Sequence, residues 1–437
     1  MRQKNFWHLL IPKSYILLKG GYSATNFRSD LIAGITVAIV ALPLSMALAI
    51  ASGTTPDKGL ITAIVAGFLI SLLGGSRYQI GGPTGAFVVV VFNVIHEFGY
   101  NGLIISSAMA GILLIFAGLL RLGTYIKYMP HPVVTGFTSG IAMIIFASQI
   151  NDFLGLDLTN IPADFIEKIN LLLGNIGNYD PYVLFLAIST LVVIVTIRKQ
   201  APKLPAFLLS IIVMSLIVWL FEIPIETIGS KFGGIPSNLP TPEFPEVTIQ
   251  TVKQLLPSAF TIAFLAGIES LLSAVVADGM TGTKHRSNCE LIAQGIANTV
   301  SALFAGLPAT GAIARTATNI RSGAYSPIAG MIHAIVLFAF ILIFAPLAAY
   351  IPLACLSAIL MVVAWNMSEF DKFIHLFKAP IGDRIVLIAT FLLTVLVDLN
   401  LAIEVGFVLS AVLFMHRMAN AVNRSEEIEN VLREHEL

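Results

Sequence analysis

Two short stretches, Gly82-Pro83-Thr84-Gly85-Ala86 and Pro308-Ala309-Thr310-Gly311-Ala312, decide the fold because each interrupts an apolar segment. A helix is disfavoured there, since glycine is conformationally free and proline lacks a backbone N–H. We therefore expect a short extended strand in each stretch, followed by a half-helix. The two threonines lie 226 residues apart and are expected to act as N-caps of half-helices over Gly85–His96 and Gly311–Ile320.

The composition indicates a protein that crosses a membrane many times. Hydrophobic residues make up 57% of the 437 residues and charged residues only 11%, against about 25% charged in a soluble protein. The mean hydropathy is +0.88. Apolar runs of about 20 residues predict membrane spans. Together with broken spans at 80–97 and 308–321, the chain is expected to hold fourteen elements, the others being 30–52, 57–74, 101–120, 131–150, 181–197, 204–221, 255–277, 289–305, 327–347, 350–366, 384–398 and 401–416.

The order of these elements predicts an all-α, seven-plus-seven inverted repeat, because an odd number of spans per repeat reverses the second copy. Pro43 and Glu269 share the offset of 226 residues. Matching broken helices in two inverted halves are the best sequence pointer to the substrate site of a transporter. Lys and Arg gather in the loops of one side, which predicts that both termini are cytoplasmic in a bacterial inner membrane.

The chain is expected to divide into three regions. Residues 1–29 form a cytoplasmic or interfacial segment, residues 30–420 the transmembrane domain, and residues 421–437 a cytoplasmic linker. Residues 369–378 place apolar side chains at helical spacing, which suits a helix on the membrane face.

The two half-helix starts predict an anion site. Each exposes free N–H groups and about half a positive charge, and such helix ends bind anions. Arg315 falls one turn into the second half-helix, and an arginine inside a membrane is a functional hypothesis by default. The alternatives are that Arg315 pairs structurally with a carboxylate or carbonyls, or that it balances Glu269. The backbone expected to hold the anion is that of Thr84, Gly85, Ala86, Phe87, Gly311, Ala312, Ile313, Ala314 and Arg315.

Glu269 is the candidate proton carrier. It lies mid-span, and its protonation would relieve repulsion with a bound anion. The alternative is a structural carboxylate with satisfied hydrogen bonds. Ser45, beside Pro43 in the first span, is expected on the opposite wall of the site.

Other function classes lack support in the sequence. There is no GxxxxGK[ST] loop, zinc-ligand cluster or nucleophile elbow, so neither ATP-driven pumping nor catalysis is indicated. Cys289 and Cys355 predict neither a disulfide framework nor a metal site. We expect no cofactor, no metal and no nucleic-acid partner.

Several of these motifs resemble the SulP (sulfate permease) family of anion transporters, over about residues 15–420. The resemblance rests on 30–36 running into 41–43, on 82–84, on 278–285 and on 310–319. Residues 267–272, 280–285 and 363–369 look most like a bacterial dicarboxylate-transporting member.

The resemblance implies a core domain, 30–121 and 254–347, that moves against a gate domain, 127–222 and 350–418. It also implies a homodimer, a STAS domain beyond the linker, and an anion site at Thr84–Phe87 and Ala312–Arg315. In the sodium-coupled bicarbonate branch, the positions matching Glu269 and Ile313 ligate sodium. Ile313 offers no side-chain oxygen, so proton coupling through Glu269 is favoured.

The resulting expectation is a secondary active transporter that moves succinate or fumarate with protons by an elevator motion. Its partners would be a small inorganic or organic anion, protons and the lipid bilayer. Sulfate and bicarbonate are the alternative substrates. Other classes that remain open are a nucleobase transporter, a passive anion channel or voltage-responsive motor, and a scaffold or receptor without transport.

Overall fold

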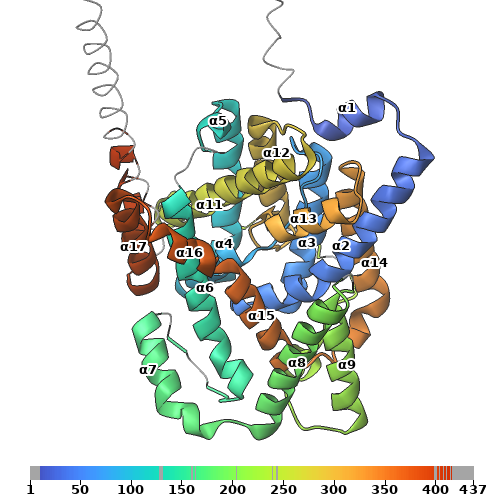
Figure 1. The fold of residues 1–437 in the computed structure, drawn as a ribbon, viewed down its shortest axis with the longest axis vertical. Helices are drawn as coiled ribbons and strands as arrows, with labels where there is room; N and C mark the ends of the chain where they lie inside the picture. The colour runs from blue at the N-terminus through green and yellow to red at the C-terminus, as the bar shows by residue number, and fades with distance from the viewer. Residues whose placement is uncertain are drawn as a thin grey trace, which may run out of the picture.

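The computed structural model describes residues 10–397 except 127–130, 159–160, 163, 203, 239 and 243–244, together with parts of 401–415. It is a helical protein with one two-stranded sheet among these residues, as the sequence predicts (Figure 1). The elements are α1 (Lys13–Lys19), α2 (Ala24–Ala51), α3 (Pro56–Leu73), β1 (Gly81–Gly82), η2 (Gly85–Phe87), α4 (Val88–Leu119), α5 (Gly123–Ile126), α6 (His131–Leu154), α7 (Phe165–Asn175), η3 (Ile176–Asn178), α8 (Pro181–Gln200), α9 (Ala206–Leu220), α10 (Ile228–Phe232), α11 (Ile249–Thr281), α12 (Ser287–Leu303), β2 (Thr310–Gly311), α13 (Ile313–Arg321), α14 (Ile328–Ala348), α15 (Leu353–Met367), α16 (Phe370–Leu376) and α17 (Ile381–Leu396).

The helices agree with the expected spans. Among the described residues, eight helices are long and apolar enough to cross a membrane. Thirteen of the fourteen expected elements coincide with a helix. Two of them, 80–97 and 101–120, share α4, which is interrupted at Gly99, where the backbone φ is 70°. The fourteenth, 401–416, is only partly described, and the expected linker 421–437 lies outside the described residues.

Helix ends follow local chemistry. The Ser23 hydroxyl accepts a hydrogen bond from Asn26 N and so caps α2. Pro56 occupies the first position of α3, where its missing N–H costs nothing. Gly282 ends α11 in the left-handed conformation, with φ 70°, and its N–H bonds to Asp278 O.

The helices pack in two groups. In the first, α4 packs on α11 and α12, and α14 packs on α2 and α3; in the second, α6 packs on α8, α15 and α17. Close approach in the first group depends on glycine, since a Cβ on Gly111 would lie 2.5 Å from Gly295 O. Small residues of this kind allow helix backbones to touch, which is the main source of packing energy between helices in lipid.

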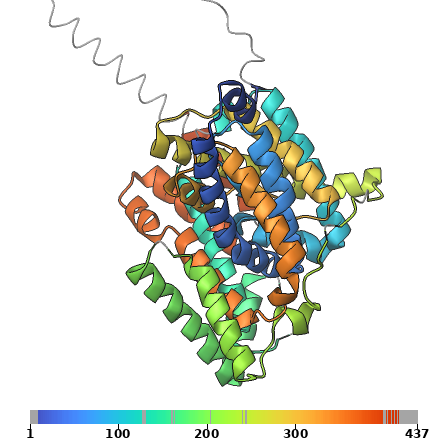
Figure 2. The same ribbon diagram turned by 90° about the vertical axis from the view of Figure 1, so that its right-hand side faces the viewer.

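Five short α-helices of the described residues lie outside the expected spans, namely α1, α5, α7, α10 and α16. The helix predicted over residues 369–378 is present as α16, and its place on the membrane face stays a prediction. The helices α7 and α10 lie in loops where no helix was predicted. The α1 and α5 helices lie at one end of the molecule and α7 at the other (Figures 1 and 2).

Candidate functional site

The two interrupted stretches meet as a pair of antiparallel strands. β1 pairs with β2 in the register Gly81–Gly311 and Gly82–Thr310. The pair is extended by a hydrogen bond of 2.8 Å from Ala312 N to Ile80 O. Because the strands are antiparallel, the half-helices that follow them leave the pair in opposite directions. The prediction of two half-helices preceded by short strands is confirmed.

The second half-helix begins later than predicted. Thr310 and Gly311 belong to the strand, the N-cap position is Ala312, and the helix starts at Ile313. The expected capping role of Thr310 and the start at Gly311 are therefore wrong, because strand pairing holds both residues extended.

The structural repeat consequently differs from the sequence repeat. Gly85 and Ile313, which start the two half-helices, lie 228 residues apart rather than 226. The counterpart of Arg315 in the first half is thus Phe87. Thr84 does occupy the first N-cap position, with φ −129° and ψ 162°, but its side chain makes no capping bond.

Both half-helix starts carry backbone N–H groups without an acceptor. Among the described residues, no acceptor is found for the backbone N–H groups of Gly85, Ala86, Ile313, Ala314 and Arg315. The first start is buried, whereas the side chains of Ile313 and Ala314 are exposed. Unsatisfied N–H groups at a helix start, with the positive end of the helix dipole, favour an anion.

Arg315 is a buried cation without a counter-ion. It is 2% exposed, and its Nη2 donates to Pro83 O at 2.7 Å. Its Nε and Nη1 have no partner, and no described carboxylate lies within 4.0 Å of the guanidinium. Arg315 bonds a carbonyl, as one alternative expected, but does not pair with Glu269. An unpaired buried charge costs several kcal/mol, so the arrangement calls for a negative ligand.

α11 forms a polar wall beside the strands. Glu269 is partly buried, and its Oε2 accepts a hydrogen bond of 2.9 Å from the Thr84 hydroxyl. One residue on, the Ser270 hydroxyl lies 2.7 Å from Thr310 Oγ1 and accepts from Gly311 N at 3.1 Å. α11 therefore joins the start of the first half-helix to the strand that precedes the second.

Ser45, the residue expected on the opposite wall, is fully buried in α2, and its hydroxyl has no hydrogen-bond partner among the described residues. Its carbonyl oxygen faces Gly59, where an added Cβ would lie 1.9 Å away. No printed hydrogen bond joins Ser45 to the half-helices, and its role stays a prediction.

A stripe of polar residues on α12, missed in the sequence reading, positions the strands. Glu290 accepts from Gly75 N at 2.8 Å and from Gln79 Nε2 at 2.8 Å. Asn298 makes two hydrogen bonds of 2.8 Å to the backbone of Ala309, just before β2. The missed signal was the spacing of Glu290, Gln294 and Asn298, which puts three polar side chains on one face of an apolar helix.

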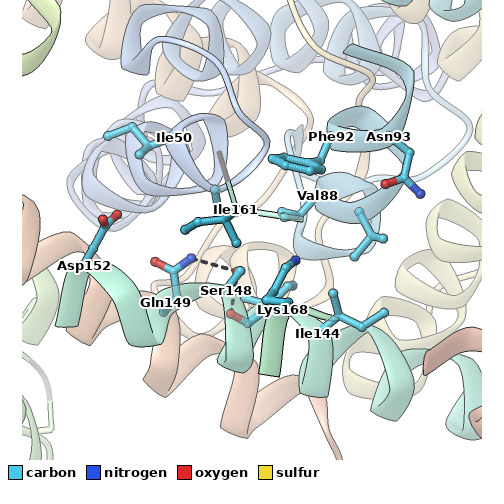
Figure 3. A pocket seen from close by; sticks show the side chains of 13 residues that line it. Ile50, Val88, Phe92, Asn93, Ile144, Ser148, Gln149, Asp152, Ile161 and Lys168 are labelled. Carbon is cyan, nitrogen blue, oxygen red and sulfur yellow. Dashed lines mark hydrogen bonds between the residues drawn. The ribbon is translucent and has the colours of Figure 1, made fainter. Parts of the chain in front are cut away.

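A cavity of about 130 Å³ lies next to the first half-helix, between α4 and α6 (Figure 3). Val88 and Val89, the residues that follow η2, form part of its lining. Among the described residues, no group of three or more His, Cys, Asp or Glu side chains could hold a metal ion.

The sequence is similar to that of a known protein family. The profile described as Sulfate permease family matches residues 27–390. The Putative sulfate transporter YvdB of Bacillus subtilis is 46% identical over 418 residues, which cover 95% of this chain and 79% of that protein. The Bicarbonate transporter BicA of Picosynechococcus sp. is 34% identical over 420 residues, which cover 93% of this chain and 73% of that protein.

Solved structures agree with the fold. The transmembrane domain of a cyanobacterium bicarbonate transporter BicA superposes with a TM-score of 0.79 at 34% identity, covering 87% of this chain and 98% of that one. The overall structure of SLC26A9 superposes with a TM-score of 0.85, covering 94% of this chain and 68% of that one. Its identity is 18%, so it supports the fold alone.

Proposed function

Because the chain belongs to the sulfate permease family, a family of anion transporters, we propose that it carries a small anion held between the starts of η2 and α13. The observation that carries the proposal is the buried Arg315 guanidinium without a counter-ion, beside two helix starts whose N–H groups lack acceptors. The ligands would be the backbone of Thr84–Phe87 and of Gly311–Arg315. The arrangement does not suit a neutral nucleobase, which would leave the charge of Arg315 unpaired.

The charge of the site depends on Glu269. Arg315 contributes one positive charge, and each helix start contributes about half a charge. An ionised Glu269, held by Thr84, subtracts one. The sum is about +1 with Glu269 ionised and about +2 with Glu269 protonated. A divalent anion is therefore best balanced together with a proton, and a monovalent anion without one.

Bicarbonate and sulfate are the first substrates to test, because the relatives named above are a bicarbonate transporter and a putative sulfate transporter. A dicarboxylate such as succinate or fumarate, the first expectation from the sequence, has the same charge as sulfate. The charge argument predicts proton symport for sulfate and dicarboxylates through Glu269.

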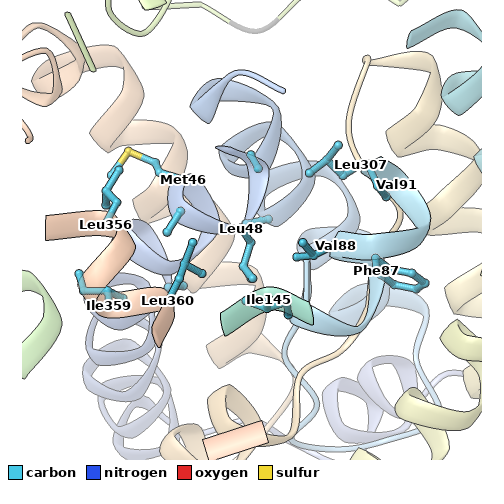
Figure 4. Packing of buried hydrophobic residues seen from close by; sticks show 14 of the residues in the cluster. Met46, Leu48, Phe87, Val88, Val91, Ile145, Leu307, Leu356, Ile359 and Leu360 are labelled. Atoms are coloured by element: carbon cyan, nitrogen blue, oxygen red, sulfur yellow. The ribbon is translucent and has the colours of Figure 1, made fainter. Parts of the chain in front are cut away.

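We infer an elevator motion of a core, 30–121 and 254–347, against a gate, 127–222 and 350–418. The contact between these parts is apolar where Leu48 and Val88 of the core face Ile145 and Leu360 of the gate (Figure 4). The polar bonds of the site, from Thr84 to Glu269 and from Ser270 to Thr310, lie within the core. An apolar contact can slide without breaking such bonds.

We place the protein in a bacterial inner membrane with both termini cytoplasmic, and as a homodimer. The orientation is supported by Lys13 and Lys19 on α1, by Arg121 before α5, and by Arg286 before α12. The α1 and α5 helices lie at the end of the molecule opposite α7 (Figure 1).

Uptake by purified protein in liposomes tests the proposal. Radiolabelled bicarbonate, sulfate, succinate and uracil would be offered at two external pH values, with and without an inward pH gradient. Accumulation of an anion above its equilibrium level, with no uracil uptake, is expected. Equilibration without accumulation would instead indicate a passive channel.

Glu269→Gln tests the coupling role. This variant keeps the shape of the side chain but cannot ionise, so a pH gradient is expected to stop driving sulfate accumulation while exchange of sulfate continues. Glu226→Gln, an exposed carboxylate before α10, is the matched control. If the Glu269 variant still accumulated sulfate with the pH gradient, Glu269 would not carry the proton.

A further inference from the structure

The cavity beside the first half-helix has features of a binding site of its own. Its floor is α6, with Ile144, Ser148 and Gln149, and its roof is α4, with Val88 and Phe92 (Figure 3). The remaining lining comes from Ile50, Ala51, Val89, Asn93, Ile145, Asp152, Ile161 and Lys168. It is thus bounded by the core on one side and by the gate on the other.

Lys168 supplies the charge of this cavity. It lies on α7, in the loop that joins α6 to α8, and points into the cavity (Figure 3). The residue is only 5% exposed, yet no hydrogen bond or ion pair to its ammonium is found among the described residues. Burial lowers the pKa of Lys168, and the nearby Asp164 opposes that effect.

The neighbours of Lys168 do not offset the cost of burying its charge. Its Nζ lies 5.6 Å from the ring centroid of Phe92, a contact that contributes a modest cation–π attraction. Asp152 also lines the cavity, but its nearest cation is Lys231, 4.0 Å away. Asp164 is occupied in capping α7, where it accepts from Ile166 N and Glu167 N. The Lys168 ammonium is therefore left for a ligand.

We propose that this cavity is a second anion site, in which Lys168 receives a small monovalent anion on the side of α7 before it reaches the half-helix start. The cavity volume of about 130 Å³ suits a small ion rather than a large organic molecule. One ammonium balances a single negative charge, since the Asp152 carboxylate in the same lining is paired with Lys231. Gln149 Nε2 and Asn93 Nδ2 are further donors in the lining.

The position of the cavity gives the second site its role. Val88 and Val89 continue directly from η2. Phe92, the ring that Lys168 contacts, follows Gly85 by about two helical turns, so an anion at Lys168 would lie close to the first half-helix start. Because Lys168 belongs to the gate and Phe92 to the core, motion between these parts would open or close the cavity. This role as a waiting site rests on the proposed function, but occupation of the cavity does not.

Chemical labelling of the lysine tests occupation directly. Purified protein would be treated with an amine-acylating reagent, and the labelling rate of Lys168 measured by mass spectrometry over a series of bicarbonate or nitrate concentrations, with gluconate holding the ionic strength constant. The anion is expected to slow labelling of Lys168 in a saturable manner, at least threefold. Lys253, at the exposed start of α11, is the internal control and should show no protection.

The same experiment in Arg315→Gln protein separates the two proposals. That variant should lose transport and retain protection of Lys168. Loss of protection in a folded Arg315→Gln protein would show that the anion acts only at the central site, and would overturn the second site. Equal labelling with and without anion in the unaltered protein would also overturn it.

Transport from the two sides provides the second readout. In Lys168→Gln, the KM for uptake from the α7 side is expected to rise about tenfold, as for loss of one hydrogen bond to a charged group, with kcat unchanged. The KM from the opposite side should not change, and Lys168→Arg should restore affinity. A rise of KM on both sides, or no rise on either, would contradict the proposal.

Discussion

Replacing Gly82 with alanine is expected to push the Arg315 guanidinium away from the paired strands. A Cβ at position 82 would lie 2.4 Å from Arg315 Nη1, whereas carbon and nitrogen atoms in ordinary contact are about 3.5 Å apart. The guanidinium therefore has to move by about 1 Å. Gly82 also has φ 155°, in the region that favours glycine.

The main consequence of this change should be lost stability. A shift of that size breaks the 2.7 Å bond from Arg315 Nη2 to Pro83 O, and a hydrogen bond to a charged group contributes about 1.5–3 kcal/mol. Backbone strain at position 82 adds about 1 kcal/mol. Anion affinity should change less. Moving a charge from about 5 to about 6 Å alters its interaction energy by about 0.5 kcal/mol at an effective dielectric constant of about 20, which is roughly a twofold effect.

Thermal unfolding in detergent, followed by intrinsic fluorescence, measures the stability term. Gly82→Ala should lower the unfolding midpoint by several degrees and weaken anion binding about twofold. Gly279→Ala is the control, because nothing lies within 4 Å of a Cβ there. A Gly82→Ala protein with the midpoint of the unaltered protein would refute the placement of Arg315 against Gly82.

Two further changes test the frame of the site and its α7 side. Asp30 is fully buried and accepts hydrogen bonds from Tyr325 N at 2.6 Å and from Ser326 N at 2.9 Å. Asp30→Asn should therefore lower the free energy of unfolding by about 2–4 kcal/mol. An unchanged unfolding midpoint would contradict this prediction. Burial lowers the pKa of Lys168 from 10.5 in the folded protein. Between the lowered pKa and 10.5, the unfolded chain therefore binds more protons at Lys168 than the folded protein does. The free energy of unfolding should rise with pH in that window. Lys168→Met should remove that part of the rise, and equal pH profiles of the two proteins would contradict it.

Much of the architecture followed from the sequence because the bilayer leaves few options. Apolar runs of span length predicted thirteen described elements, since a helix satisfies every backbone group within lipid. The stretches around Pro83 and Pro308 predicted the strands, because glycine and proline disfavour a helix. The expected N-cap threonine of each stretch predicted the half-helices. The short helices α7 and α10 were not predicted. A helix in a loop does not have to cross the bilayer, so no apolar run of span length marks it in the sequence.

The details of the site were less predictable. The register of β1 with β2 places Thr310 and Gly311 in a strand, which depends on hydrogen bonds to Ile80 and Ser270 from distant parts of the chain. The N-cap at Ala312 was not predicted for the same reason, because it follows from the pairing of the two strands. The burial of Lys168 was not predicted, because burial of a loop residue is set by packing and not by local sequence.

Equilibrium binding of radiolabelled sulfate to Arg315→Gln protein tests the central claim most directly. A unit charge about 5 Å from the anion contributes about 3 kcal/mol at an effective dielectric constant of about 20, so binding should weaken by about 100-fold. Arg321→Gln, an exposed arginine at the end of the same helix, is the matched control and should bind like the unaltered protein. A folded Arg315→Gln protein that bound sulfate with unaltered affinity would contradict the account.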